Sequence, residues 1–128
     1  MRYLLDTHAF LWAAVDDPEL PRAARAIIIQ PKNECFLSAA SVWKMAIKLS
    51  LGKLALSLSL EQFVRHGLQN GIRLLDVTAD HVYRVEHLPF HHRDPFDRVL
   101  VAQALHEGMV LMSRDEQIDA YAVPRTWA

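Results

Sequence analysis

The sequence contains one cysteine, four glycines and no long apolar run, and each scarcity narrows what the chain can be. A single thiol excludes an intramolecular disulfide, and the position of Cys35 in the apolar stretch Cys35–Leu37 indicates a small buried side chain. No apolar segment is long enough to cross a bilayer, and Asp6 interrupts the N-terminal one before a signal peptide could form. We therefore expect a cytoplasmic protein with no membrane partner.

The chain also has no large excess of basic or of acidic side chains. The chain has 14 basic and 15 acidic side chains, which give a formal net charge of -1. This balance creates no global positive field toward nucleic acid, so any contact with nucleic acid must be local. The 128 residues, of which 52% are hydrophobic, are most simply one compact domain, residues 1–128, with a sizeable core.

Apolar runs alternate with helical patterns along the chain. The runs predict strands at Tyr3–Leu5, Cys35–Leu37, Ile72–Leu75 and Met109–Met112, and a last short strand at Ala122–Pro124. Capping signals predict helices after Asp6, at Pro21, after Ser38 or Ser41, after Ser59 with Gln62, after Thr78, and after Asp94 with Pro95. Because the strands lack the period-two pattern of a one-sided sheet, we expect an α/β protein with a parallel sheet covered on both faces.

The segment from Arg2 to Trp12 holds the first candidate site residue. An apolar strand ends there at Asp6, and a helical pattern begins at once. Ligands of open α/β sheets bind beyond the carboxyl ends of the strands, so Asp6 stands where chemistry is expected if this strand is central. The alternative is that Asp6 or Thr7 only caps the helix. Position alone does not decide between the two.

Two further acids occupy comparable places. Asp97 lies in the first turn of an apolar helix, and Asp115 follows the strand that ends at Met112. If the sheet brings both to Asp6, the cluster suits Mg²⁺ or Mn²⁺, which can activate water and neutralise charge developing on phosphorus. These acids also have simpler roles. Asp97 could merely favour the positive end of its helix, and Asp115 could merely start a turn. The neighbouring Asp94 is most easily explained as the cap of the helix that carries Asp97. Together, the three placements favour a metal site.

Other functional groups give weaker signals. The seven histidines include the pair His91–His92, but none shows zinc-site spacing, so we expect ordinary surface histidines. No glycine-rich loop could hold a nucleotide, and Ser113 has no evident base beside it. We assign the three tryptophans to the core or an interface rather than to base stacking.

Four segments, in order, resemble the PIN-domain ribonucleases, particularly the VapC-like toxins of toxin–antitoxin pairs. They are Leu4–His8, Ser38–Trp43, Asp94–Arg98 with Val101–Ala104, and Ser113–Asp115. The third is the most specific, and the resemblance runs nearly end to end. It implies a three-layer α/β/α sandwich with a parallel sheet of four to five strands, RNA cleavage dependent on Mg²⁺ or Mn²⁺, a homodimer and a small antitoxin as partner.

The resemblance also implies roles for particular residues. The catalytic acids at the metal would be Asp6, Asp97 and Asp115, and the supporting residues would be Thr7, Asp94 and Ser113. Arg98 or Arg114 could contact RNA phosphate and supply the local positive charge that the overall balance lacks.

One position departs from the family pattern. Members with the Ser-Val-Trp segment usually carry glutamate next, as a further metal-site acid, whereas this chain has Lys44. An ammonium repels a metal ion and cannot bind it, so we expect metal affinity and cleavage to fall. Lys44 would also spoil a capping box with Ser41. The alternative is that Lys44 is an ordinary solvated residue beside Lys48 and that three aspartates suffice.

Three functions remain open at this point. The first is an endoribonuclease toxin impaired by Lys44, and the second is a catalytically inactive module that only binds antitoxin and a second copy. The third, more remote, is a metal-independent protein whose acids are caps. We expect the antitoxin to lay a helix in an apolar groove near the first helices, with a basic side chain reaching the acidic site.

Overall fold

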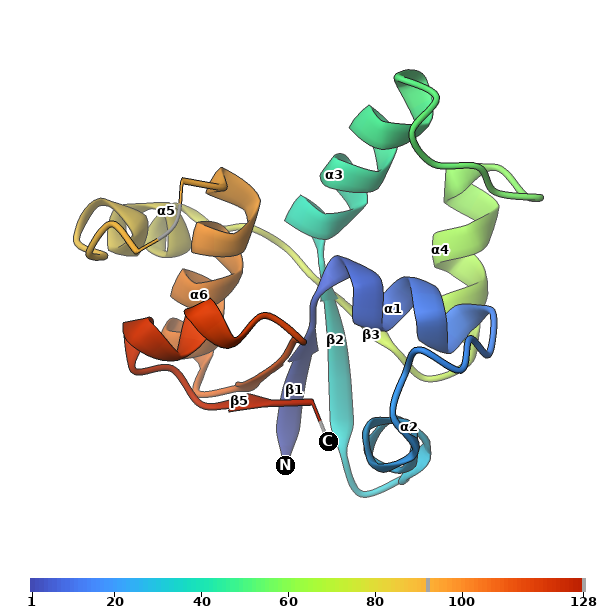
Figure 1. Cartoon of the computed structure of the whole chain (residues 1–128), viewed down its shortest axis with the longest axis horizontal. Helices are drawn as coiled ribbons and strands as arrows, with labels where there is room; N and C mark the ends of the chain where they lie inside the picture. The colour runs from blue at the N-terminus through green and yellow to red at the C-terminus, as the bar shows by residue number, and fades with distance from the viewer. Residues whose placement is uncertain (92, 128) are drawn as a thin grey trace.

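A computed structural model describes residues 1–91 and 93–127, so His92 of the histidine pair and Ala128 lie outside the description. Five parallel strands form one sheet in the order β3-β2-β1-β4-β5 (Figure 1). They are β1 (Arg2–Leu5), β2 (Glu34–Ser38), β3 (Arg73–Leu75), β4 (Val110–Met112) and β5 (Arg125–Thr126). The predicted parallel sheet is confirmed, and the first strand of the chain is its central strand.

Helices cover both faces of the sheet. One face carries α1 (Thr7–Ala14), α2 (Arg22–Ile29), α3 (Ala39–Ser50) and α4 (Leu60–Gln69), and the other carries α5 (Ala79–Glu86), α6 (Pro95–Glu107) and the 3₁₀ helix η1 (Glu116–Tyr121) (Figure 1). Side chains alternate across the sheet, so Leu4 packs with α6 whereas Leu5 packs with α1. The three-layer α/β/α sandwich is therefore confirmed. Within the described residues, no helix has the length and apolar character needed to span a bilayer.

The helix starts follow the capping signals of the sequence. The Ser59 and Gln62 side chains form a capping box at α4, Thr78 caps α5, and Asp94 caps α6. At α3 the cap is Ser38, whose Oγ accepts a hydrogen bond from the Ala40 N–H at 3.0 Å. Lys44 therefore lies in the second turn, and the prediction that it spoils a capping box with Ser41 is wrong.

The last strand was predicted too early. Ala122 ends η1 in the left-handed conformation with a φ of 56°, and its N–H donates to the Asp119 carbonyl. The chain extends only after this turn, and β5 begins at Arg125. The predicted strand at Ala122–Pro124 is therefore the turn that leads into β5.

Cys35 is 4% exposed on β2, and burial raises the pKa of its thiol to about 11. Because the thiolate is the reactive form, we expect the folded chain to react with iodoacetamide at pH 8 on the order of 100-fold more slowly than a free cysteine. Mass spectrometry of timed samples measures this rate, and the same chain in urea should react at the ordinary rate. Equal rates for the folded and the unfolded chain would contradict the burial of this thiol.

Candidate functional site

Asp6 lies at the carboxyl edge of the sheet, directly after the central strand. Leu5 pairs in register with Leu37 of β2 and with Met112 of β4. The Asp6 N–H extends this ladder by donating to the Met112 carbonyl at 3.0 Å. Asp6 is thus flanked by the ends of two parallel strands, the position at which open α/β sheets bind ligands.

The Asp6 carboxylate is held by its surroundings. Its Oδ1 accepts from the Ala9 N–H at 2.8 Å, so Asp6 does cap α1, as the simpler interpretation required. Burial raises the pKa of this carboxyl group, while the Ala9 N–H, a hydrogen bond with the Ser113 hydroxyl, and the charges of His8 and Lys44 act in the opposite direction. The pKa stays raised, so the burial of this negative charge is only partly compensated.

Ser113 connects Asp6 with the loop that carries Asp115. Ser113 follows β4, is 1% exposed, and accepts at Oγ from the Asp115 N–H at 3.1 Å. The same hydroxyl hydrogen-bonds with Asp6. Asp115 in turn caps η1 through a hydrogen bond from the Gln117 N–H to Oδ1 at 3.0 Å. This arrangement supports a positioning role for Ser113.

Lys44 forms an ion pair with Asp94 across the same edge. Asp94 accepts at Oδ1 from the Phe96 N–H at 2.8 Å, which confirms Asp94 as the cap of α6. Its Oδ2 lies 3.3 Å from the Lys44 Nζ. Only 19% of the Lys44 side chain is exposed, and its charge also acts on Asp6. We call the carboxyl edge of the sheet at Asp6, Asp94 and Asp115 the acidic edge. Lys44 is therefore part of the acidic edge rather than an ordinary solvated residue.

The three predicted metal ligands do not form a closed cage. Among the residues that the structure describes, one group of three histidine or acidic side chains brings its ligand atoms within 4.8 Å of one another, and it contains none of Asp6, Asp97 and Asp115. Mg²⁺, however, usually takes one or two carboxylates and keeps several waters. Carboxylate oxygens are in their chemistry the ligands that a water-rich cation of this kind takes.

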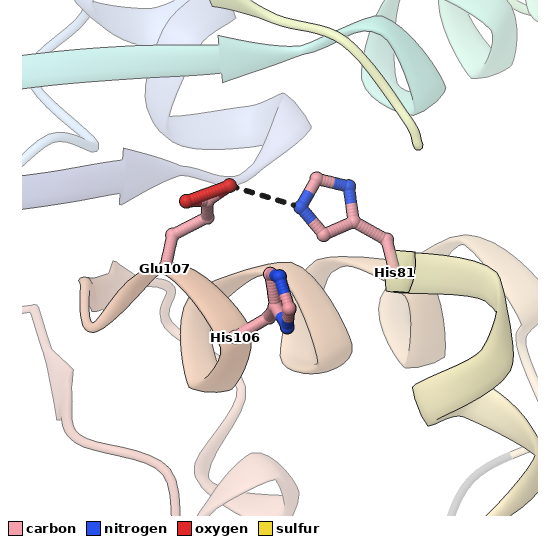
Figure 2. Close-up of side chains that lie close together, drawn as sticks. All are labelled: His81, His106 and Glu107. Atoms are coloured by element: carbon pink, nitrogen blue, oxygen red, sulfur yellow. Dashed lines mark hydrogen bonds and ion pairs between the residues drawn. The ribbon is translucent and has the colours of Figure 1, made fainter. Parts of the chain in front are cut away.

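The close group consists of His81 of α5 with His106 and Glu107 of α6, shown in Figure 2. Although ordinary surface histidines were expected, His81 is fully buried. Its Nε2 lies 3.2 Å from Glu107 Oε1, and the two histidine rings meet edge to face at 5.3 Å (Figure 2).

The hydrogen bonds of His81 argue against a metal at this group. Its Nδ1 accepts from the Thr78 N–H at 3.0 Å, and the Gln103 Nε2 lies 3.3 Å from the same atom. A histidine that ligates metal through one ring nitrogen normally donates a hydrogen bond from the other. Here Nδ1 is the acceptor, so the proton of the neutral ring is on Nε2 and points to Glu107. The group is a structural link between α5 and α6.

The two candidate RNA contacts differ in their surroundings. Arg98 is 5% exposed, and its guanidinium donates to the carbonyls of Val85, Leu88 and Pro89. Donors used in this way are not available to phosphate, so we do not retain Arg98 as an RNA contact. Its role is to hold the end of α5 against α6.

Arg114, by contrast, is exposed beside the acidic edge. Its guanidinium lies 4.9 Å from the Trp12 ring and 3.5 Å from a Glu19 carboxylate oxygen. The charges of Arg114, Lys44 and Lys48 all act on His8, whose pKa is lowered first by burial and then by these cations, against the opposite effect of Asp6. Three basic side chains therefore lie close enough to act on His8, two residues from Asp6, although the formal net charge of the chain is -1.

The model of the PIN domain family matches residues 3–124. No curated protein matches the sequence.

Solved structures with similar folds include two of VapBC proteins and one of VapC20. VapBC2 from Rickettsia felis bound to a promoter DNA fragment has 14% identity, 98% of each chain covered and a TM-score of 0.73. DNA-bound VapBC from Salmonella typhimurium has 15% identity, 100% of this chain and 99% of that chain covered and a TM-score of 0.71. VapC20 from Mycobacterium tuberculosis, a toxin that cleaves the sarcin-ricin loop, has 16% identity, 98% of this chain and 99% of that chain covered and a TM-score of 0.66. At these identities the likeness shows a shared fold.

Proposed function

The chain belongs to the PIN domain family, and from this premise we propose that it is a VapC-like toxin, an endoribonuclease dependent on Mg²⁺ or Mn²⁺, whose cleavage is impaired by Lys44. One observation carries the proposal. Asp6 lies at the carboxyl end of the central strand, hydrogen-bonded with Ser113 and beside the Lys44 charge. VapC20, which has the same fold, is described as an RNA-cleaving toxin, and this supports RNA as the substrate.

The residues of the edge have separate tasks in this proposal. Asp6, Asp97 and Asp115 would hold the cation, which when bound would neutralise charge on the phosphodiester and activate water. Ser113 orients Asp6 relative to the Asp115 loop. Thr7 and Asp94 support the site from the first residue of α1 and the cap of α6.

Positive charge near the site would receive the RNA strand. Arg114 is exposed and lies close enough to His8 for its charge to act there. A guanidinium at this place would pair with a backbone phosphate, which gives affinity without sequence selection. Arg114 is therefore the arginine that we retain as a phosphate contact.

Impairment by Lys44 follows from electrostatics. The ammonium lies 3.3 Å from Asp94 and acts on Asp6, so a divalent cation at this edge would meet a positive charge already in place. The proposal of impairment does not require loss of the fold, because Lys44 is accommodated in α3 by its ion pair.

For the small antitoxin we propose a cavity of about 570 Å³ beside α1, α2 and α4. Its lining is mixed, with apolar Phe10, Ile28 and Ile72 beside polar Asn33 and Asn70. An amphipathic helix with apolar anchors would bind a groove of this composition.

We further propose that the chain forms a homodimer and that it acts in the cytoplasm, the compartment expected from the sequence.

Cleavage in the Lys44→Glu background tests the proposed function. We expect Mn²⁺-dependent cleavage of structured RNA that chelator abolishes and that Asp6→Asn lowers at least about 100-fold, since the carboxylate that holds the cation is lost. Asp80→Asn, which alters an exposed acid on α5, is the matched control and should keep full activity. Cleavage that survives both chelator and Asp6→Asn would contradict the proposal.

The second candidate is an inactive module that only binds antitoxin, and the Lys44–Asp94 ion pair favours it. Association with the product of the neighbouring gene, without cleavage by either the original chain or its Lys44→Glu variant, would select this function over the first. If the chain did not associate with that product, the antitoxin would be excluded as a partner under both candidate functions.

A further inference from the structure

Trp43 is the one tryptophan that the fold leaves open to solvent. It is 64% exposed in α3, whereas Trp12 and Trp127 are partly buried and contact each other with ring centroids 5.9 Å apart. Of the two places expected for the tryptophans, the core and an interface, the core is therefore excluded for Trp43. Exposure alone does not mark a binding site, because Tyr83 and Phe90 are at least as exposed, so the argument depends on what surrounds Trp43.

Trp43 is fixed in place by an aromatic neighbour from another helix. The Phe96 ring of α6 meets it edge to face at a centroid distance of 5.1 Å and an interplanar angle of 67°. Because the two rings are not stacked face to face and most of Trp43 remains exposed, aromatic surface is left for a further ring. A planar group could stack there without displacing Phe96.

The Trp43–Phe96 pair lies beside the acidic edge. Lys44 follows Trp43, and its Nζ lies 5.9 Å from the Phe96 ring and 3.3 Å from Asp94. Asp97 follows Phe96 in the first turn of α6. An aromatic surface with a cation next to it, at the place proposed for a phosphodiester, is the composition of a single-strand nucleic-acid site.

We propose that Trp43 is a stacking platform for an unpaired base of the RNA substrate, next to the phosphodiester that the acidic edge receives. This rests on the proposed function, because it assumes an RNA substrate at that edge. A base fits better than a protein surface, since α3 exposes no other large apolar side chain among the described residues. One exposed ring supplies far less apolar area than a specific protein interface buries.

Binding of RNA, measured apart from cleavage, tests the platform. Fluorescence anisotropy of a labelled single-stranded 12-nucleotide RNA, with chelator present, gives the affinity of the full chain and its variants. We expect Trp43→Ala to weaken binding by about 5- to 150-fold, the range for one stacked base, and Trp43→Phe to keep most of the affinity. Tyr83→Ala is the matched control, because Tyr83 is 66% exposed on α5 and should not matter.

A second probe distinguishes stacking from a general loss of structure. An abasic strand of the same length should bind equally to the original chain and to Trp43→Ala, because the base that stacks is absent. Three outcomes would overturn the proposal. The original chain and Trp43→Ala could bind the ordinary RNA equally well, Trp43→Ala could weaken binding of the ordinary and the abasic strand by the same factor, or the original chain could fail to bind RNA. Sedimentation showing that Trp43→Ala only dissociates a dimer or an antitoxin complex would overturn it as well. Failure here leaves the nuclease proposal to be judged by cleavage in the Lys44→Glu variant.

Discussion

Replacing Lys44 with glutamate is expected to raise Mn²⁺-dependent RNA cleavage by on the order of 100-fold. The change removes an ammonium that pairs with Asp94 and acts on Asp6, and it places a carboxylate in the second turn of α3 at the same edge. A catalytic metal stabilises charge in the transition state by several kcal/mol, so restoring its site has a large effect on rate. Initial rates on a structured RNA, with Mn²⁺ and with chelator, measure the change.

Two variants separate the causes of this effect. Lys44→Met removes the charge without adding an oxygen ligand, so we expect it to recover only part of the rate. Lys48→Glu makes the same charge change one turn further along α3, where the lysine charge acts on His8 but is not among those that act on Asp6, and it should not restore cleavage. Equal rates for the original chain and for Lys44→Glu would mean that three aspartates suffice or that this edge is not the active site.

Arg98→Met is expected to lower the free energy of unfolding by about 3 kcal/mol or more. The buried guanidinium donates to the Pro89 carbonyl at 2.8 Å, to Val85 at 3.1 Å and to Leu88 at 3.2 Å. Methionine fills similar volume but removes the charged donor from all three carbonyls. The Val85 and Pro89 carbonyls still accept from the Leu88 and His91 N–H groups, so the expected loss is that of hydrogen bonds to a charged group, each worth about 1.5–3 kcal/mol. Urea unfolding followed by circular dichroism measures the difference.

The control for Arg98 is Arg65, an exposed arginine on α4. Arg65 pairs with Glu61 one turn away, with 62% of its side chain exposed, and an exposed pair contributes well under about 1 kcal/mol. Arg65→Met should therefore change the unfolding midpoint very little. If the two variants lost the same stability, the structural role assigned to Arg98 would be wrong.

Local signals account for the part of the fold that the sequence predicted. Helix starts at Ser59, Thr78 and Asp94 are set by side chains that bond to backbone within three residues, so they are visible in the chain itself. The order of the strands depends on crossovers between distant segments and was not predicted. The last strand was misplaced because the left-handed turn at Ala122 depends on how η1 packs.

The candidate site was likewise predicted from the sequence only in part. Asp6 could be placed at the sheet edge because a strand end and a helix start meet there in the sequence. The Lys44–Asp94 pair joins residues 50 positions apart, so its existence could not be inferred before the fold was known. Charge alone made Arg98 a candidate RNA contact, and only burial showed that its donors serve the α5–α6 junction.

The most direct test of the account is calorimetric titration of Mn²⁺ into the original chain, Lys44→Glu and Lys48→Glu. A metal site suppressed by Lys44 predicts saturable one-site binding in Lys44→Glu that is at least about 10-fold tighter than in the other two proteins. Adding Asp6→Asn to Lys44→Glu should remove that binding. Equal Mn²⁺ affinity in all three proteins, or tight binding that survives Asp6→Asn, would contradict the assignment of this edge as a metal centre disabled by Lys44.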